Sequence, residues 1–247
     1  MTPFVCAPPA ARLHGRVVDT RTLAASTREA MFTLLTSHFV GADRTTFERD
    51  LDEKSSAILL EDDAGHLRGF STMVAYESHA SGRSVWVVYS GDTIVERAWW
   101  GTPALARTWV RAVRQLAPVN ARDVYWLLLT SGFRTYRFLP VFFRDFYPRY
   151  DRDTCVEQEL LSTLARERFG AQYDEESGIV RLTTPQVLAP DLIALPEGRL
   201  TDPHVAFFLA RNAGFVRGDE LACLALIDDS NLTPAARRMT RAALAED

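Results

Sequence analysis

The feature that most restricts the fold of this chain is a strand, a helix and a second strand that follow one another between residues 85 and 130. Val85–Val95 reads as a long strand. A helix is predicted over 103–116, with Thr102 as its cap, Pro103 in its first turn and an apolar stripe of Leu105, Trp109, Val113 and Leu116. Val124–Thr130 (VYWLLLT) is a continuous apolar run, as in a strand buried on both faces. A strand, a crossover helix and a strand place the two strands side by side and parallel, which predicts a mixed α/β fold.

The first of these strands is interrupted by Gly91-Asp92. Glycine inside a strand weakens pairing and often marks a bulge. A bulge here would splay the strand away from Val124–Thr130 and leave backbone N–H and C=O groups without partners. An extended ligand that contains amides can pair with them, and the free N–H groups of a helix that begins at 101–103 suit a phosphate. The sequence therefore predicts a cleft that fits pantetheine phosphate.

The rest of the chain supplies further strands and helices for the same sheet. Before the central unit, strands are predicted over 12–19, 57–61 and 67–76, and helices over 26–39 and 43–53. After it come helices over 154–170 and 202–214, strands over 178–183 and 221–227, a loop over 185–200 and a last helix from 233. This order predicts one mixed sheet rather than two unrelated domains.

Composition excludes several classes of function. The chain carries 28 basic and 32 acidic residues, a net charge of −4, which disfavours nucleic acid as a partner. Its three cysteines and five histidines lack the spacing of a metal site, so no metal is expected, and the cysteine usage indicates a reducing cytoplasm. No apolar run approaches the ~20 residues of a membrane span, and the start of the chain has no signal-peptide pattern.

Charge is unevenly distributed along the chain. Residues 97–152 hold ten Arg against three Asp and no Glu, a local charge of +7, whereas the remainder holds 18 basic against 29 acidic residues, a charge of −11. The middle of the chain therefore favours an anionic ligand or partner. An Arg-rich solvated surface is the alternative interpretation.

The element order resembles that of the GNAT superfamily of acyl-CoA N-acyltransferases. In that superfamily the turn before the central helix reads Q/R-x-x-G-x-G/A and holds the pyrophosphate of CoA; here residues 97–104 read RAWWGTPA, with one extra residue before Gly101. The SGDTI strand (90–94), Tyr125-Trp126, the GFRTY segment (132–136) and the tail 211–224 resemble an uncharacterised bacterial GNAT-like group. The resemblance implies a lead-in over 1–11, an acyltransferase core over 12–150 and a C-terminal α/β extension over 151–247 packed on the same sheet.

The resemblance and the predicted splay together give a set of candidate site residues. Acyl-CoA, or a phosphopantetheine thioester on an acyl carrier protein, would be a co-substrate and not a permanently bound cofactor. Its expected contacts are Thr93, Ile94, Val95, Arg97, Gly101, Thr102, Ala104 and Ser131. Asp92 is the carboxylate nearest the splay and the first candidate for the base that deprotonates an amine, with Glu96 as the second. Tyr136 lies where the superfamily often places the acid that protonates the thiolate.

Other interpretations of these residues stay open. Asp92 can instead bind the backbone of the bulge, Glu96 can be a solvated residue, and Tyr136 can belong to an aromatic core, because 133–150 holds eight aromatic residues. The predicted function is transfer of an acyl group from a pantetheine thioester to an amine of a small molecule. The alternative is a GNAT-like module without catalysis that binds a ligand or protein. Homodimerisation is a further possibility.

Overall fold

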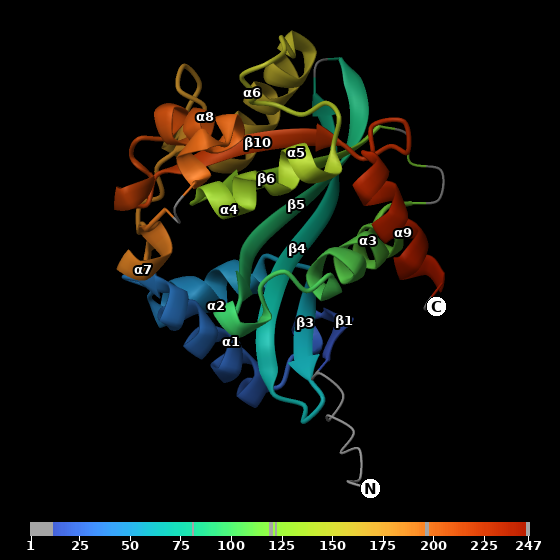
Figure 1. Ribbon diagram of the computed structural model, residues 1–247, viewed down its shortest axis with the longest axis vertical. Coiled ribbons are helices and arrows are strands. Elements are labelled where there is room, and N and C mark those ends of the chain that lie inside the picture. The colour runs from blue at the N-terminus through green and yellow to red at the C-terminus, as the bar shows by residue number, and fades with distance from the viewer. Residues whose placement is uncertain (1–11, 81, 119–120, 122, 196–197, 246–247) are drawn as a thin grey trace, which may run out of the picture.

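The computed structural model describes residues 12–80, 82–118, 121, 123–195 and 198–245. The lead-in that was expected over 1–11 lies outside these residues. Within the described part of the chain, no helix is both long and apolar enough to cross a membrane. One large sheet runs through the molecule, and helices cover both of its faces (Figure 1).

Eight strands of the described residues form this sheet, in the order β1-β3-β4-β5-β6-β10-β8-β7. Their bounds are β1 Leu13–Asp19, β3 Ser56–Asp62, β4 Leu67–Ala80, β5 Arg83–Val95, β6 Val124–Thr130, β10 Glu220–Leu226, β8 Ile179–Val180 and β7 Tyr173–Asp174. Neighbouring strands are antiparallel except β5 and β6, which are parallel. The predicted mixed sheet with a central parallel pair is confirmed.

In the N-terminal half, helices α1 (Ala25–His38) and α2 (Arg44–Asp52) cover one face of the sheet and α3 (Ala104–Leu116) covers the other. Successive residues of β3 point to opposite faces, so Leu59 packs beneath α1 and α2 and Leu60 packs beneath α3. The helix α3 begins at Ala104 with Pro103 as its N-cap and without a side-chain cap, so the predicted capping by Thr102 is wrong.

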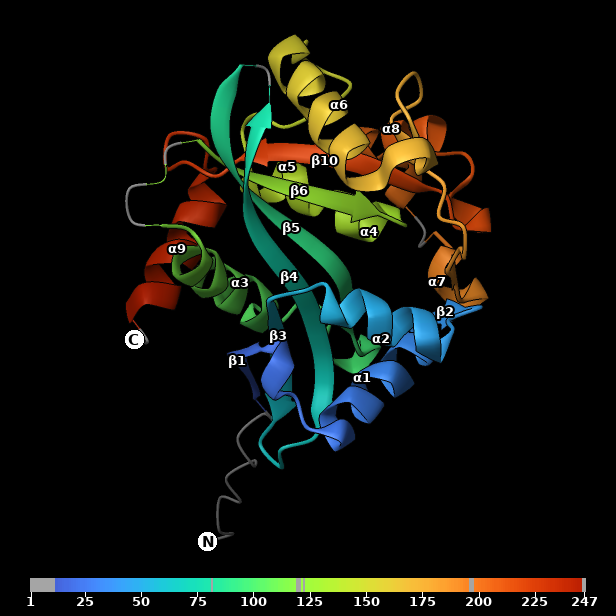
Figure 2. The ribbon, with the colours of Figure 1, turned by 180° about the vertical axis from the view of Figure 1, so that it is seen from behind.

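In the C-terminal half, β6 and β10 are covered in the same way. The helices α4 (Phe133–Tyr136), α5 (Phe138–Phe142) and α8 (Pro203–Arg211) pack on the face that α3 covers, and α6 (Cys155–Phe169) packs on the other. The last helix, α9 (Pro234–Ala245), lies beside α3 (Figure 1). Figure 2 looks onto the opposite face, where α1, α2 and α6 lie in front of the sheet.

The predicted bulge is present in β5. Ser71 of β4 pairs with Thr93 and Met73 pairs with Ser90, so Gly91 and Asp92 together face a single residue of β4. A Cβ on Gly91 would lie 2.6 Å from Thr72 Oγ1 and 2.8 Å from Lys54 Cε, which explains why glycine occupies this position. The parallel pairing of β5 with β6 ends at Ser90 and Leu128, although both strands continue beyond it. The two strands therefore part where the sequence predicts.

The segment after α6 differs most from the sequence-based expectation. The strand predicted over 178–183 is reduced to the two residues of β8. The stretch predicted as a loop over 185–200 contains the strand β9 (Val187–Leu188) and the short helix α7 (Pro190–Ile193). The strand β9 pairs with β2 (Phe39–Val40), a contact between distant parts of the chain that no local pattern signals.

Candidate active site

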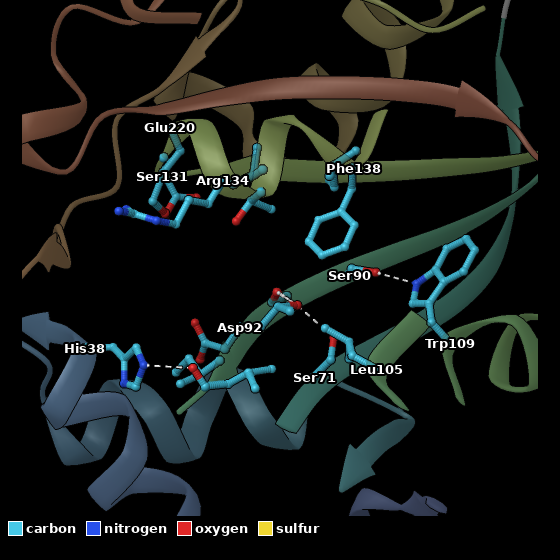
Figure 3. Close-up of a pocket in the computed structure, with 18 of the residues that line it drawn as sticks. His38, Ser71, Ser90, Asp92, Leu105, Trp109, Ser131, Arg134, Phe138 and Glu220 are labelled. Carbon is cyan, nitrogen blue, oxygen red and sulfur yellow. Dashed lines mark hydrogen bonds between the residues drawn. The ribbon is translucent and has the colours of Figure 1, made fainter. Parts of the chain in front are cut away.

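A cavity of about 930 Å³ opens where β5 and β6 part. Its walls come from the bulged end of β5, the end of β6, the start of α3 and the first residue of β10 (Figure 3). The cavity continues between α3, α5 and α9 on one side of the sheet and reaches α2 and α6 on the other. A cavity of this size is typical of a site for a small molecule or cofactor.

The backbone of β5 offers hydrogen-bonding groups to this cavity. Glu96 N donates to Arg68 O on β4 at 2.8 Å, and the directions of N–H and C=O alternate along a strand. Ile94 N–H therefore faces β4, where Ile94 is paired with Phe70, whereas the N–H groups of Thr93 and Val95 point away from β4 into the gap. Ile94 lines the cavity as predicted, but Thr93 and Val95 are the residues whose N–H groups face the gap.

One group on this edge already has protein partners. Val95 O accepts hydrogen bonds from His38 Nε2 at 3.1 Å and from Trp100 Nε1 at 2.7 Å. The hydroxyl of Thr93 contacts Ser71 Oγ at 2.7 Å (Figure 3). These contacts hold the end of β5 in place, because β6 no longer pairs with β5 beyond Ser90.

The Asp92 carboxyl lies in the cavity without a hydrogen-bond partner among the described residues (Figure 3). Burial, and after it the charge of Asp50, raises the pKa of Asp92 to about 7, and the charge of Lys54 opposes this shift. Lys54 itself is buried and donates to Asp50 Oδ1 at 2.6 Å. Since no backbone group of the bulge binds Asp92, its carboxyl is available to a ligand.

A second carboxyl, on Glu220 at the start of β10, lines the same cavity. Glu220 Oε1 accepts a hydrogen bond from Ser131 Oγ at 2.7 Å, and burial raises the pKa of Glu220 to about 7. Sequence reasoning included Ser131 but missed Glu220. The one available signal was that Glu220 lies in the segment 211–224, which resembles the GNAT-like group. That segment has no recognisable spacing of catalytic residues.

The start of α3 also opens onto the cavity. Gly101, which has φ +85°, and Thr102 both line it, followed by Leu105 and Ala106 of the helix. The first N–H groups of a helix have no partner within the helix and attract anions. Ala104 does not line the cavity and packs against the core beneath α3, so any contact from it is limited to its N–H.

Besides Ala104, three further predicted site residues lie outside the cavity. Tyr136 is fully buried among aromatic side chains, and its hydroxyl donates to Pro148 O at 2.8 Å, so it is not the acid. Glu96 is paired with Arg68 at 3.2 Å and does not line the cavity, which removes it as the base. Arg97 is held by Asp191 at 2.6 Å and faces a smaller neighbouring pocket.

No family model matches the chain, and no curated protein matches it. Among solved structures, a probable N-acyltransferase from Enterococcus faecalis, described as a conserved protein of unknown function, is 13% identical; the match covers 63% of this chain and 44% of that one, with a TM-score of 0.39. A GNAT family N-acetyltransferase from Escherichia coli in complex with CoA is 19% identical over 54% of this chain and 71% of that one, with a TM-score of 0.39. This chain spans less than half the length of the first.

A third structure is a GNAT family acetyltransferase from Brucella melitensis in complex with acetyl-CoA. It is 16% identical, and the match covers 51% of this chain and 81% of that one with a TM-score of 0.36. At these values the likeness concerns the arrangement of strands and helices over about half of the chain. By its own geometry, the chain is a mixed α/β protein with a cavity where two parallel strands part.

Proposed function

We propose that this protein transfers an acyl group from a pantetheine thioester to an amine of a small molecule. The observation that carries the proposal is the parting of β5 and β6 after Ser90 and Leu128, because it leaves the N–H groups of Thr93 and Val95 facing a cavity that also contains Asp92. Amides of a pantetheine arm pair with that strand edge, and the thioester carbonyl then lies at the bulge. Fixed alignment of this kind supplies much of the catalysis in acyl transfer.

The proposed reaction uses Asp92 as the base. The carboxylate takes a proton from the acceptor amine, and the nitrogen attacks the thioester carbonyl. The C–N bond forms, the C–S bond breaks, and the thiolate takes up a proton to give an amide and a free thiol. With Tyr136 committed to the core, Ser131 is the proposed proton donor: its hydroxyl gives a proton to the thiolate and takes one back from the protonated form of Glu220, which its pKa of about 7 keeps populated near neutral pH.

Two donors fit this site. The start of α3 suits the phosphates of CoA, whereas the charge of +7 over 97–152 suits an acidic acyl carrier protein. The acceptor is proposed to be a small-molecule amine, and the protein is proposed to act in the cytoplasm.

Binding can be tested without knowing the acceptor. Trp99, Trp100, Trp109 and Trp126 line the cavity, so a thioester that enters it is expected to change the intrinsic fluorescence of the protein. Acetyl-CoA, acyl-pantetheine and acyl carrier protein would be titrated in turn, and release of free thiol would then be followed with a panel of amines. Failure of all three donors to bind contradicts the proposal.

The non-catalytic alternative has one observation in its favour. The residue expected to protonate the thiolate, Tyr136, points into the core and not into the cavity. A protein that binds a thioester but releases no thiol with any amine, and whose biological activity is unchanged by Asp92→Asn, would be a binding module.

A further inference from the structure

One arm of the cavity is apolar and has no part in the chemistry described above. It lies between α3, α5 and α9, and each helix contributes one face to it. The lining residues are Leu105, Ala106, Trp109 and Val110 of α3, Phe138 and Phe142 of α5, and Ala236, Met239 and Thr240 of α9. Their spacings of three and four residues are those of side chains on one face of a helix. None of them is charged.

The indole N–H groups of the two tryptophans near this arm already have a partner. The indole N–H of Trp109 donates to Ser90 Oγ at 3.3 Å (Figure 3), and that of Trp126 donates to the same oxygen at 2.9 Å. Only the apolar faces of the two rings are left for a ligand. Figure 3 shows that apolar and polar side chains are separated in the cavity. Trp109, Leu105 and Phe138 lie on one side, and Asp92, Arg134 and Glu220 lie on the other.

The side chains that line the arm are incompletely covered by protein. Leu105, Trp109, Val110, Phe138 and Met239 are half-buried although they face inward, and Phe138 stacks on Phe142 with ring centres 5.7 Å apart. Contiguous apolar surface of this kind is costly in water and usually marks a binding site for an apolar group.

The position of the arm identifies the group that it holds. Ser90 is the last residue of β5 that pairs with β6, so the arm begins at the point where the strands part. A pantetheine arm laid along Thr93 and Val95 ends with its thioester at Asp92, and the acyl group continues from there toward Ser90. Leu105 to Val110 spans about 7.5 Å of helix, which leaves room for several carbons beyond an acetyl group.

We propose that this arm binds the hydrocarbon tail of a medium-length aliphatic acyl thioester, and that Met239 on α9 limits the length of the tail. The inference rests on the proposed function and names its donor class. An acetyl group would leave most of the arm in contact with water. Met239, the residue proposed to limit the length of the hydrocarbon tail, comes from the C-terminal part of the protein, whereas the thioester would lie on β5.

The test is a calorimetric titration of the full chain with CoA and with saturated acyl-CoAs of increasing length, repeated with the matching acyl-pantetheines. Burial of each added CH₂ is expected to raise the affinity by up to about fourfold, until the arm is full and the gain stops. Met239→Trp is expected to stop the gain at a shorter chain and Met239→Ala at a longer one. Arg238→Trp adds the same bulk at an exposed position of α9 outside the cavity and is expected to behave as the unmodified protein.

The outcomes separate this inference from the function on which it rests. Binding of CoA or pantetheine with an affinity that does not depend on chain length overturns the acyl arm and leaves the proposed acyl transfer standing. A length dependence that shifts equally in Met239→Trp and Arg238→Trp also overturns the assignment to α9. Absence of binding by every thioester overturns both. Because Met239→Ala changes the limit in the opposite direction, misfolding of the Trp variant does not remove the test.

Discussion

Asp92 is a half-buried carboxyl on the wall of the cavity, and it has no ion-pair partner of its own among the described residues. Its pKa of about 7 results first from burial and then from the nearby charge of Asp50. Near neutral pH it exists in both forms, so it can accept a proton from an amine and return it. This one side chain is therefore expected to influence two measurable properties, the rate of the proposed acyl transfer and the dependence of stability on pH.

Asp92→Asn is expected to lower the rate of acyl transfer by about 100- to 10,000-fold, the usual contribution of a general base. The affinity for the thioester donor should change little, because the donor is held by backbone groups. The rate of the unmodified protein should rise with pH through about 7, as the Asp92 carboxylate forms. Thiol release measured between pH 5.5 and 8.5 checks both expectations, with Glu159→Gln on the exposed side of α6 as a charge-matched control. An unchanged rate in Asp92→Asn would exclude Asp92 as the base.

The same carboxyl is expected to destabilise the fold at alkaline pH. Its pKa rises from 3.8 to about 7 on folding, so between these values the native state binds more protons than the unfolded state. Stability is therefore lost as pH rises across this range, and the loss is complete above pH 7. Asp92→Asn should melt at a higher temperature than the unmodified protein at pH 8, with a difference that shrinks toward pH 5. A difference that grows at low pH would contradict the raised pKa.

Gly91→Ala is expected to destabilise the protein by about 1–3 kcal/mol, the usual cost of forcing a methyl group into a filled space. The added carbon would lie 2.6 Å from Thr72 Oγ1. Thr72→Ala in the same chain should restore part of the loss, since it removes the closest atom. Denaturant titration of the single and double variants measures the effect. No recovery in the double variant would indicate that Lys54, and not Thr72, sets the limit.

At the scale of single residues, the sequence identified positions better than orientations. Gly91-Asp92 was predictable because a glycine inside a strand, next to a short polar residue, is typical of a bulge. The orientation of Tyr136 could not be predicted, because the segment 133–150 is rich in aromatic residues and only packing decides which ring faces the core. Glu220 was out of reach for a similar reason: its partner Ser131 is brought to it by the pairing of β10 with β6.

At the scale of the elements, the start of α3 distinguishes the two proposed donors. Its free N–H groups and positive helix end attract a phosphate, whereas the strand edge of β5 binds amides without regard to charge. A donor that carries a nucleotide uses both elements. A donor that carries only the pantetheine arm depends mainly on β5.

Thr102→Glu is expected to weaken binding of acyl-CoA by about two- to fivefold, because a negative charge at the helix start competes with the phosphates. Binding of an acyl-pantetheine without phosphate should not change. Glutamine has nearly the same size as glutamate and no charge, so Thr102→Gln serves as the control in the same titrations. Equal weakening of both ligands would show that Thr102 acts through the shape of the cavity and not through charge.

The elements that the sequence predicted well are long or strongly patterned. The bounds of β6 match the apolar run, and α3 starts within one residue of the prediction. The elements that it missed are short. A two-residue strand such as β9 exists because β2 lies opposite it, so its cause is a tertiary contact and not a local preference.

At the scale of the whole molecule, the expected division into a core over 12–150 and an extension over 151–247 does not correspond to two separate hydrophobic cores. Both clusters that flank β6 draw residues from before and after position 150, such as Leu128 with Cys223 on one face and Leu127 with Leu224 on the other. The strand β10 also pairs with β6 along the edge opposite to β5. The extension therefore shares the core of the protein.

The full chain is expected to unfold in one cooperative transition, and a chain that ends at residue 150 is expected not to fold. Its loss of α6, α8 and β10 would expose both faces of β6 to water. Circular dichroism and calorimetry of the two chains check this prediction. A soluble 1–150 chain with a sharp thermal transition would show that the extension folds onto an independent domain.

The walls of the cavity are drawn from opposite ends of the chain, and this has an evolutionary consequence. The strand edge that holds the thioester is fixed by the central sheet, where most substitutions cost stability. On the helix face of α9, Ala236 is buried, whereas Met239 and Thr240 are half-buried, so substitutions at these two positions are expected to cost less stability. Directed evolution for a new donor should therefore recover most of its successful changes from Met239 and Thr240.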